Sequence, residues 1–390
     1  VAAPRRRAER VSVRKSRPPA GAVAARKGGG IVAIVDGGIA EVGSPDVGQV
    51  REWLAEAERN PAGLPDAGYL ALLETDGPEL DRLGELADAV RKQSVGDAVT
   101  YVVNRNLDTA AVSGSAARDR LAALVAEAYE LGATEICMQG PLPADSDDDY
   151  LSLVAAVTGS APLHLHAFRP EELLDGAARL GVPLDEYLVR AKASGLGSVP
   201  GTGARILDDD VRARLKGGPD LPVSEWVRVI EAAHRAGLTS TATMVYGHIE
   251  TPAQQLAHLR LLAEIQDRTG GFTEFIAMPM DPVTAAAGFR TPEVPERLRR
   301  QSRAVHAVAR LLLHGRIDNI QAAWPRLGVT AAVELLSCGA NDFGGLLLDG
   351  RLAPESGPEA GLTLTVEDVE RIAGELGRTL RQRTTQYGWI

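Results

Sequence analysis

Apolar residues follow two rhythms along this chain, and each rhythm predicts one kind of element. From Asp97 onward, short apolar runs typical of buried strands are separated by longer stretches that carry polar residues on one helical face. Strands and helices are therefore expected to alternate over most of the chain. The runs predict eight strands, the last two from weaker patterns: Thr100–Asn104, Thr134–Met138, Leu163–Phe168, Leu196–Val199, Thr239–Val245, Glu274–Met278, Asn319–Trp324 and Ala340–Phe343.

The segments between the predicted strands have the period of amphipathic helices. One apolar stripe is formed by Leu121, Leu124, Val125 and Ala128. Glycine follows several predicted helix ends, as at Gly132, where it supplies a left-handed cap before the next strand. Repeated helix–glycine–strand units imply parallel strands with helical crossovers. The pattern therefore predicts an α/β fold, a (β/α) barrel of the TIM type, with a doubly wound sheet as the alternative.

The N-terminal part of the chain has a different character. Its first 27 residues hold nine Lys or Arg side chains and one Glu, so we expect 1–45 to be a basic disordered tail. A solvated tail is the favoured interpretation; a transit peptide, an anion-binding arm and an over-extended gene start are alternatives. Core-like spacings predict helices over 48–60 and 77–93. We therefore expect an N-terminal helical extension at 46–97, and a barrel with a C-terminal helical segment at 98–390.

Composition narrows the classes of function. The chain has 390 residues, is 45% hydrophobic and shows no apolar run long enough for a membrane span. Its net charge of −10 argues against nucleic acid as the main partner. The two cysteines, Cys137 and Cys338, suggest no disulfide framework and fit a reducing compartment. We therefore expect a cytoplasmic protein without membrane or nucleic-acid partners.

Polar residues stand where several predicted strands end. In a (β/α) barrel the functional site lies at these carboxyl ends, in the loops that lead to the helices. This rule selects Gln139-Gly140, His166, Gly201-Thr202, Tyr246-Gly247-His248, Pro279, Trp324 and Asn341-Asp342.

Two further patterns carry chemistry. His164 and His166 share one face of a strand and could contribute to a metal site, although one core histidine on a strand is the commoner situation. A metal-dependent hydrolase is therefore a minor alternative, and we expect no metal. The loop with Tyr246, His248 and Glu250 combines a phenol, an imidazole and a carboxylate, which suits acid–base chemistry.

Six successive segments of the chain resemble one family. The resemblance is to the radical S-adenosylmethionine FO synthases, in their hydroxyphenyl-transferase half, with menaquinone-pathway enzymes as relatives. It implies a (β/α) barrel and the transfer of a tyrosine-derived hydroxyphenyl group to a ribitylaminouracil in deazaflavin cofactor biosynthesis. The segments are Tyr101–Asn106, Glu135–Gly140, His164–Phe168, Tyr246–Pro252, Gly270–Phe275 and Asn341–Gly345.

The departures from this family affect its cofactors. The resemblance implies a C-x-x-x-C-x-x-C loop soon after Asn106, but 107–118 contains no cysteine. It also implies an acid near the cofactor ribose, where this chain has Arg205. We therefore expect the iron–sulfur cluster and S-adenosylmethionine to be lost, and a preference for carboxylate or phosphate groups at Arg205.

The resulting hypothesis is an FO-synthase-like barrel protein without radical activity, which binds a small molecule or a protein partner from the same pathway. One alternative is a non-radical enzyme acting on an aromatic or uracil-like metabolite; another is a sequence defect near 107–118. The catalytic candidates are Tyr246, His248 and His166, and the ligand-binding candidates are Asn104, Gln139, Thr202, Arg205, Glu250, Trp324, Asn341 and Asp342.

Overall fold

The computed structural model describes residues 31–35, 38–42, 46–280, 295–347, 352 and 362–390. The chain divides into two compact units, Val1–Ser44 and Pro45–Ile390. In the first unit, β1 (Ile31–Val35) and β2 (Gly38–Val42) form an antiparallel pair. These strands lie within the range for which the sequence predicted a disordered tail, while residues 1–30 of that range lie outside the described residues.

The second unit is built around one curled sheet of ten strands, and each strand pair in it is parallel. Its order is β12-β3-β11-β10-β9-β8-β7-β6-β5-β4. The eight predicted strands are all present, which confirms the α/β fold of the TIM type. The strands are β3 (Val99–Val102), β4 (Asn104–Asp108), β5 (Glu135–Gln139), β6 (His164–Ala167), β7 (Leu196–Val199), β8 (Thr239–Tyr246), β9 (Phe272–Pro279), β10 (Ile320–Ala322), β11 (Asp342–Gly345) and β12 (Leu380–Gln382).

The first predicted strand pairs with strands from both ends of the β/α series. It is divided at Val103 into β3, which pairs with β11 and β12, and β4, which pairs with β5. The single run Val99–Asp108 therefore connects the first and the last strands of the β/α series. This connection gives the sheet an inner face, towards which alternate side chains of each strand point.

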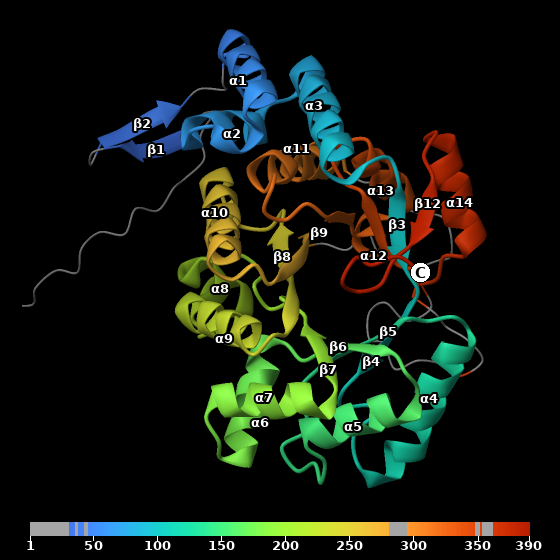
Figure 1. Cartoon of the computed structure of the whole chain (residues 1–390). Coiled ribbons are helices and arrows are strands. Elements are labelled where there is room, and N and C mark those ends of the chain that lie inside the picture. The colour runs from blue at the N-terminus through green and yellow to red at the C-terminus, as the bar shows by residue number, and fades with distance from the viewer. Residues whose placement is uncertain (1–30, 36–37, 43–45, 281–294, 348–351, 353–361) are drawn as a thin grey trace, which may run out of the picture. The chain divides into compact units, whose positions relative to one another are not determined.

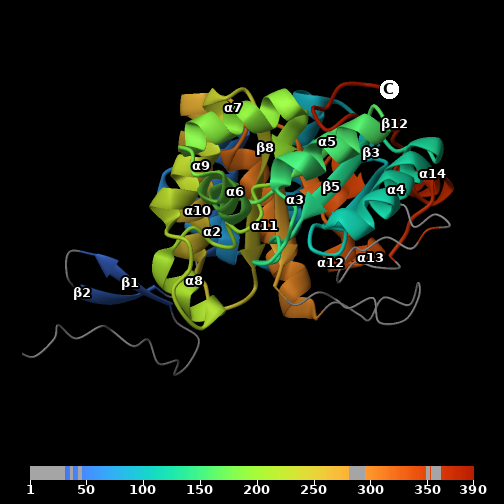
Figure 2. The ribbon, with the colours of Figure 1, turned by 90° about the horizontal axis from the view of Figure 1, so that it is seen from below.

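Helices cover the outer face of the sheet (Figures 1 and 2). Glycines in the left-handed conformation end several of them, as at Gly195 and Gly270, and turn the chain into the next strand. The outer helices are α4 (Arg118–Glu130), α5 (Tyr150–Ser160), α6 (Pro170–Leu180), α7 (Leu184–Ser194), α8 (Asp209–Lys216), α9 (Val223–Arg235), α10 (Pro252–Thr269), α11 (Glu296–Leu312), α12 (Trp324–Leu327), α13 (Val329–Leu336) and α14 (Val366–Glu375).

Three helices precede the barrel strands: α1 (Val47–Arg59), α2 (Asp66–Glu74) and α3 (Gly77–Val95). Helices α2 and α3 pack on α11, α2 also packs on α10, and α1 packs on α2 and α3 (Figure 1). Among the helices that the structure describes, none has both the length and the apolar character needed to cross a bilayer.

Candidate functional site

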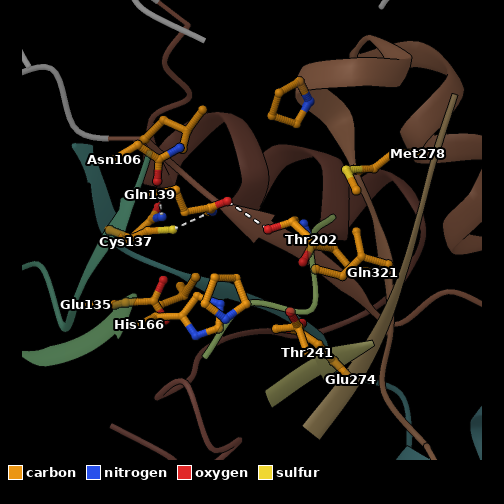
Figure 3. A pocket seen from close by; sticks show the side chains of 18 of the residues that line it. Asn106, Glu135, Cys137, Gln139, His166, Thr202, Thr241, Glu274, Met278 and Gln321 are labelled. Atoms are coloured by element: carbon orange, nitrogen blue, oxygen red, sulfur yellow. Dashed lines mark hydrogen bonds between the residues drawn. The ribbon is translucent and has the colours of Figure 1, made fainter. Parts of the chain in front are cut away.

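The inner face of the curled sheet is polar at many positions and surrounds a cavity of about 160 Å³ (Figure 3). Every second residue of β5 faces this cavity, namely Glu135, Cys137 and Gln139. The same period places Glu274 and Met278 of β9 on its wall. Barrels of this type usually fill their interior with layers of apolar side chains. The polar wall therefore makes this cavity the candidate site.

Strand register sets the polar residues side by side. Asn106, Cys137 and His166 are neighbours across β4, β5 and β6. One step nearer the strand ends, Gln139 accepts a hydrogen bond of 2.8 Å from Thr202 Oγ1 and donates to Cys137 Sγ at 3.3 Å (Figure 3). The predicted residues Gln139, His166 and Thr202 thus lie together on the cavity wall.

Asn104, another predicted residue, also lines the cavity and is 6% exposed. Its Nδ2 donates to Asn106 Oδ1 at 3.0 Å, whereas its buried Oδ1 accepts no hydrogen bond. A Cβ at Gly345 would lie 2.2 Å from that oxygen, so only glycine fits beside it. Asn104 Oδ1 is therefore a buried hydrogen-bond acceptor on the cavity wall that no described group of the protein uses.

His166 is joined to His164 through one hydroxyl. Ser198 Oγ lies 2.7 Å from His166 Nδ1 and 2.7 Å from His164 Nε2. Burial, and to a smaller degree the Arg383 guanidinium, lower the pKa of His166 to about 3, and burial lowers that of His164 as well. Both imidazoles are neutral at pH 7. Because the hydroxyl has one proton, it donates to one ring and accepts from the other.

A charged cluster lies against the same cavity, centred on Arg383, which follows β12 and is 2% exposed. Its Nε and Nη2 donate to Asp342 at 2.5 and 2.9 Å, and Nη2 also donates to Glu274 at 3.1 Å. Tyr387 donates to Glu274 at 2.6 Å and stacks 4.1 Å below the guanidinium. We call Arg383, Asp342, Glu274 and Tyr387 the Arg383 cluster. Burial raises the pKa of Glu274 to about 7, although Arg383 opposes that shift.

The loop with the other two catalytic candidates is placed elsewhere. Tyr246 is fully buried and bonds Ser302 Oγ at 2.6 Å, and burial raises its pKa. Glu250 accepts the backbone N–H groups of Gly247 and His248 at 2.7 and 2.9 Å. Burial alone would raise the pKa of Glu250, but His248 and these N–H groups lower it to about 2. The carboxylate organises the loop, and none of Tyr246, His248 and Glu250 is among the residues that line the cavity.

The four remaining candidates form hydrogen bonds or ion pairs with other residues of the protein. Arg205 pairs with Asp220 rather than facing the cavity. Trp324 Nε1 donates to the Gly345 carbonyl at 2.9 Å. Asn341 accepts from Arg310 at 2.9 Å and from a backbone N–H, so its polar atoms are engaged. Asp342 reaches the site only through the Arg383 cluster.

Sequence reasoning missed several residues of the wall. Glu135 and Glu274 carried a usable signal, because each is a charged residue at an inward position of an otherwise apolar strand. Arg326 and Arg383 carried none, since only the folded chain brings α12 and the segment after β12 to the cavity.

Comparisons with known proteins identify the family of this chain. Residues 271–390 match the family model described as the CofH/MqnC C-terminal region. An FO synthase of Nocardia farcinica is 44% identical over 86% of this chain, and an FO synthase of Mycobacterium tuberculosis is 42% identical over 86%. The chain spans only about 41% of the length of the first of these and 42% of the second. A 5-amino-6-(D-ribitylamino)uracil–L-tyrosine 4-hydroxyphenyl transferase of Methanosarcina mazei is 37% identical over 86% of this chain and 93% of its own length.

Solved structures support the fold. The FeFe-hydrogenase maturase HydG from Carboxydothermus hydrogenoformans gives a TM-score of 0.62 at 13% identity, covering 87% of this chain and 81% of its own. Methylornithine synthase gives 0.58 at 16% identity, covering 84% and 97%. At these identities the likeness concerns the fold alone.

These relatives correct one expectation. The similarity to FO synthases contradicts the prediction that the iron–sulfur cluster and S-adenosylmethionine are lost, so that prediction is wrong. The cysteine count limits only the ligands that this chain supplies, and does not justify the absence of the cofactors.

The two cysteines of this chain lie in different parts of the fold. Cys137 lies on the cavity wall, whereas Cys338 packs against α3, with its Sγ 3.0 Å from the position of a Cβ on Gly84. Within the described ranges, no group of three or more His, Cys, Asp or Glu side chains is placed to hold a metal. A cluster needs three or four thiolates, so no step of the chemistry below is assigned to one.

Proposed function

Because this chain belongs to the FO synthase family, we propose that its barrel binds a uracil-like or aromatic metabolite in the polar cavity. One observation carries the proposal, the set of carboxamides on the cavity wall. A carboxamide offers a donor and an acceptor side by side, as the imide edge of a uracil does. The carboxamides belong to Asn104, Asn106, Gln139 and Gln321.

The wall is also suited to a flat ring. Ile276 and Met278 of β9 add apolar surface beside the carboxamides. The cavity of about 160 Å³ is comparable to engineered cavities that hold one benzene molecule. The name of the Methanosarcina mazei relative, which includes a ribitylaminouracil and a tyrosine, supports both ring types.

We also propose a protein partner from the same pathway. The FO synthase relatives are more than twice as long as the part that this chain matches, which is about 41% of the first of them. In this proposal the present chain supplies a ligand-binding barrel, and the partner acts on the same ligand.

Calorimetric titration with 5-amino-6-(D-ribitylamino)uracil tests the binding function. Gln139→Met keeps the length of the side chain but removes its hydrogen bonds, so we expect affinity to fall about 3- to 10-fold. The matched control is Gln49→Met on the exposed side of α1, which should bind like the wild type. Absence of saturable binding by the wild type, or equal loss in both variants, would contradict the proposal.

A second function, acid–base catalysis in the same cavity, is favoured by the His164–Ser198–His166 arrangement. His166 Nδ1 is bound to Ser198, which leaves its Nε2 as the nitrogen available to other groups. When His166 takes up a proton at Nε2, its Nδ1 can release one to Ser198 Oγ, and the Ser198 hydroxyl can pass its own proton to His164 Nε2. A reaction of this kind should be lost in His166→Gln and weakened in Ser198→Ala, whereas simple ligand binding should survive the second substitution.

A further inference from the structure

Arg326 is a cation of the cavity wall, and the residues that the structure describes place no counter-charge beside it. It belongs to the short helix α12, after β10, and its side chain lines the cavity. Its buried Nε has no hydrogen-bond partner, and among the described residues no carboxylate pairs with its guanidinium. Two buried arginines, by contrast, are satisfied: Arg383 by two carboxylates, and Arg310 by backbone carbonyls and Asn341. Arg326 as a whole is partly exposed, but its Nε is buried, and a buried donor without an acceptor needs an explanation.

The carboxylates of the cavity are already engaged. Glu274 accepts from Arg383 and Tyr387, and Glu135 accepts from Thr385 Oγ1 at 2.6 Å. Neither of these two carboxylates pairs with Arg326, so among the described residues of the wall it is open to an anion from a ligand. The unused acceptor of Asn104 lies on the same wall, and it calls for an N–H or O–H donor.

We propose that Arg326 binds the anionic group of the cavity's ligand, while Asn104 Oδ1 accepts a hydrogen bond from a donor on the same molecule. The inference rests on the proposed function, because it concerns the same cavity. A planar guanidinium recognises carboxylate and phosphate groups through paired N–H donors. Apolar neighbours on the wall, Ala323, Pro325 and Leu347, leave room for an unsubstituted ring edge or alkyl carbon next to that group. The ligand class is therefore a small ring compound that carries a carboxylate or a phosphate.

Calorimetric titration of the full chain with three probes tests this assignment. Sodium benzoate supplies a ring with a carboxylate, benzamide is its neutral counterpart of similar shape, and inorganic phosphate is the alternative anion. Charge-assisted hydrogen bonds predict that Arg326→Gln weakens benzoate binding about 10- to 100-fold, and that Arg326→Lys recovers part of the loss. Arg228→Gln, an exposed arginine of α9 paired with Glu225, is the control and should bind benzoate like the wild type. Urea unfolding of each variant verifies that the fold is intact.

The outcomes separate this inference from the proposed function. A selective loss of benzoate binding in Arg326→Gln supports it, and a selective loss of phosphate binding supports it with phosphate as the ligand group. Equal affinity of the wild type for benzoate and benzamide, an unchanged benzoate affinity in Arg326→Gln, or no saturable binding of either anion overturns it. The ribitylaminouracil probe is titrated in parallel. If it binds while benzoate and phosphate do not, the assignment of Arg326 is wrong and the proposed binding function stands. If benzoate or phosphate binds and the ribitylaminouracil does not, the assignment of Arg326 stands and the proposed binding function is wrong.

Discussion

Glu274 provides the sharpest test of the electrostatics in this barrel. It is 4% exposed and belongs to the Arg383 cluster, where it shares the Arg383 guanidinium with Asp342. Burial disfavours its ionised form, and the nearby Asp342 adds to that effect, so the pKa of Glu274 is raised to about 7. Replacing it by glutamine preserves the shape and one acceptor but removes the titration.

The sign and the size of the effect follow from this shift. A carboxyl whose pKa is higher in the folded state than in the unfolded chain favours folding at low pH. Its contribution is complete below the unfolded pKa of about 4.5 and is lost as pH rises through about 7. A difference of about 2.5 pKa units corresponds to roughly 3 kcal/mol. Between pH 4.5 and pH 8, the wild type should therefore lose about 3 kcal/mol relative to Glu274→Gln.

Urea unfolding at several pH values measures this difference directly. Other groups titrate in both proteins, so the free energy of unfolding of the wild type minus that of Glu274→Gln isolates the one carboxyl. Glu225→Gln is the control, because Glu225 is exposed, pairs with Arg228 and lies outside the cavity. Gln266→Glu would not serve as a control, because Gln266 bonds the backbone of Phe272. Parallel pH profiles of the wild type and Glu274→Gln would refute the reasoning.

Three further substitutions probe the scaffold of the site by urea unfolding. Arg383→Met should cost about 3–5 kcal/mol, because it leaves two buried carboxylates without their cation; a loss below 1 kcal/mol would argue against the cluster. Ser198→Ala should cost about 1–2 kcal/mol and change the ¹⁵N NMR signals of the two imidazoles it bridges; unchanged signals would exclude the bridge. Gly345→Ala should cost about 1–3 kcal/mol, because its Cβ would lie 2.2 Å from Asn104 Oδ1, whereas Gly374→Ala in α14, which meets nothing within 4 Å, should be neutral or stabilising.

Much of the fold could be predicted because buried parallel strands are apolar runs bounded by glycine-capped helices. Strand β12 was missed, since Leu380–Gln382 is short, polar and paired on one side only, with β3. The division of the first strand was not visible either. The alternation of side chains along Val99–Asp108 does not show which strands pair with its two halves. That pairing depends on the partner strands, which are β11 and β12 for β3 and β5 for β4.

The site was predicted in part, and the reason is local. The rule that strand ends carry function found Gln139, His166 and Thr202. The same rule also selected the loop of Tyr246, whose polar groups turn out to bond within the protein. Sequence order does not show whether a carboxylate such as Glu250 faces a ligand or the backbone N–H groups beside it.

Hydrogen-bond satisfaction separates scaffold from site more clearly than residue type does. Asn341 and Glu250 looked like binding residues, yet each has its polar atoms engaged by the protein, so neither needs a ligand. Asn104 and Arg326 each keep a buried polar atom that the protein does not satisfy, and both atoms lie on the same cavity wall. Because folding leaves these two atoms buried without a hydrogen bond, a ligand that satisfies both should gain affinity that the scaffold residues cannot provide. The ligand that fits this cavity is therefore a small ring compound with an anionic group for Arg326 and an N–H or O–H donor for Asn104 Oδ1.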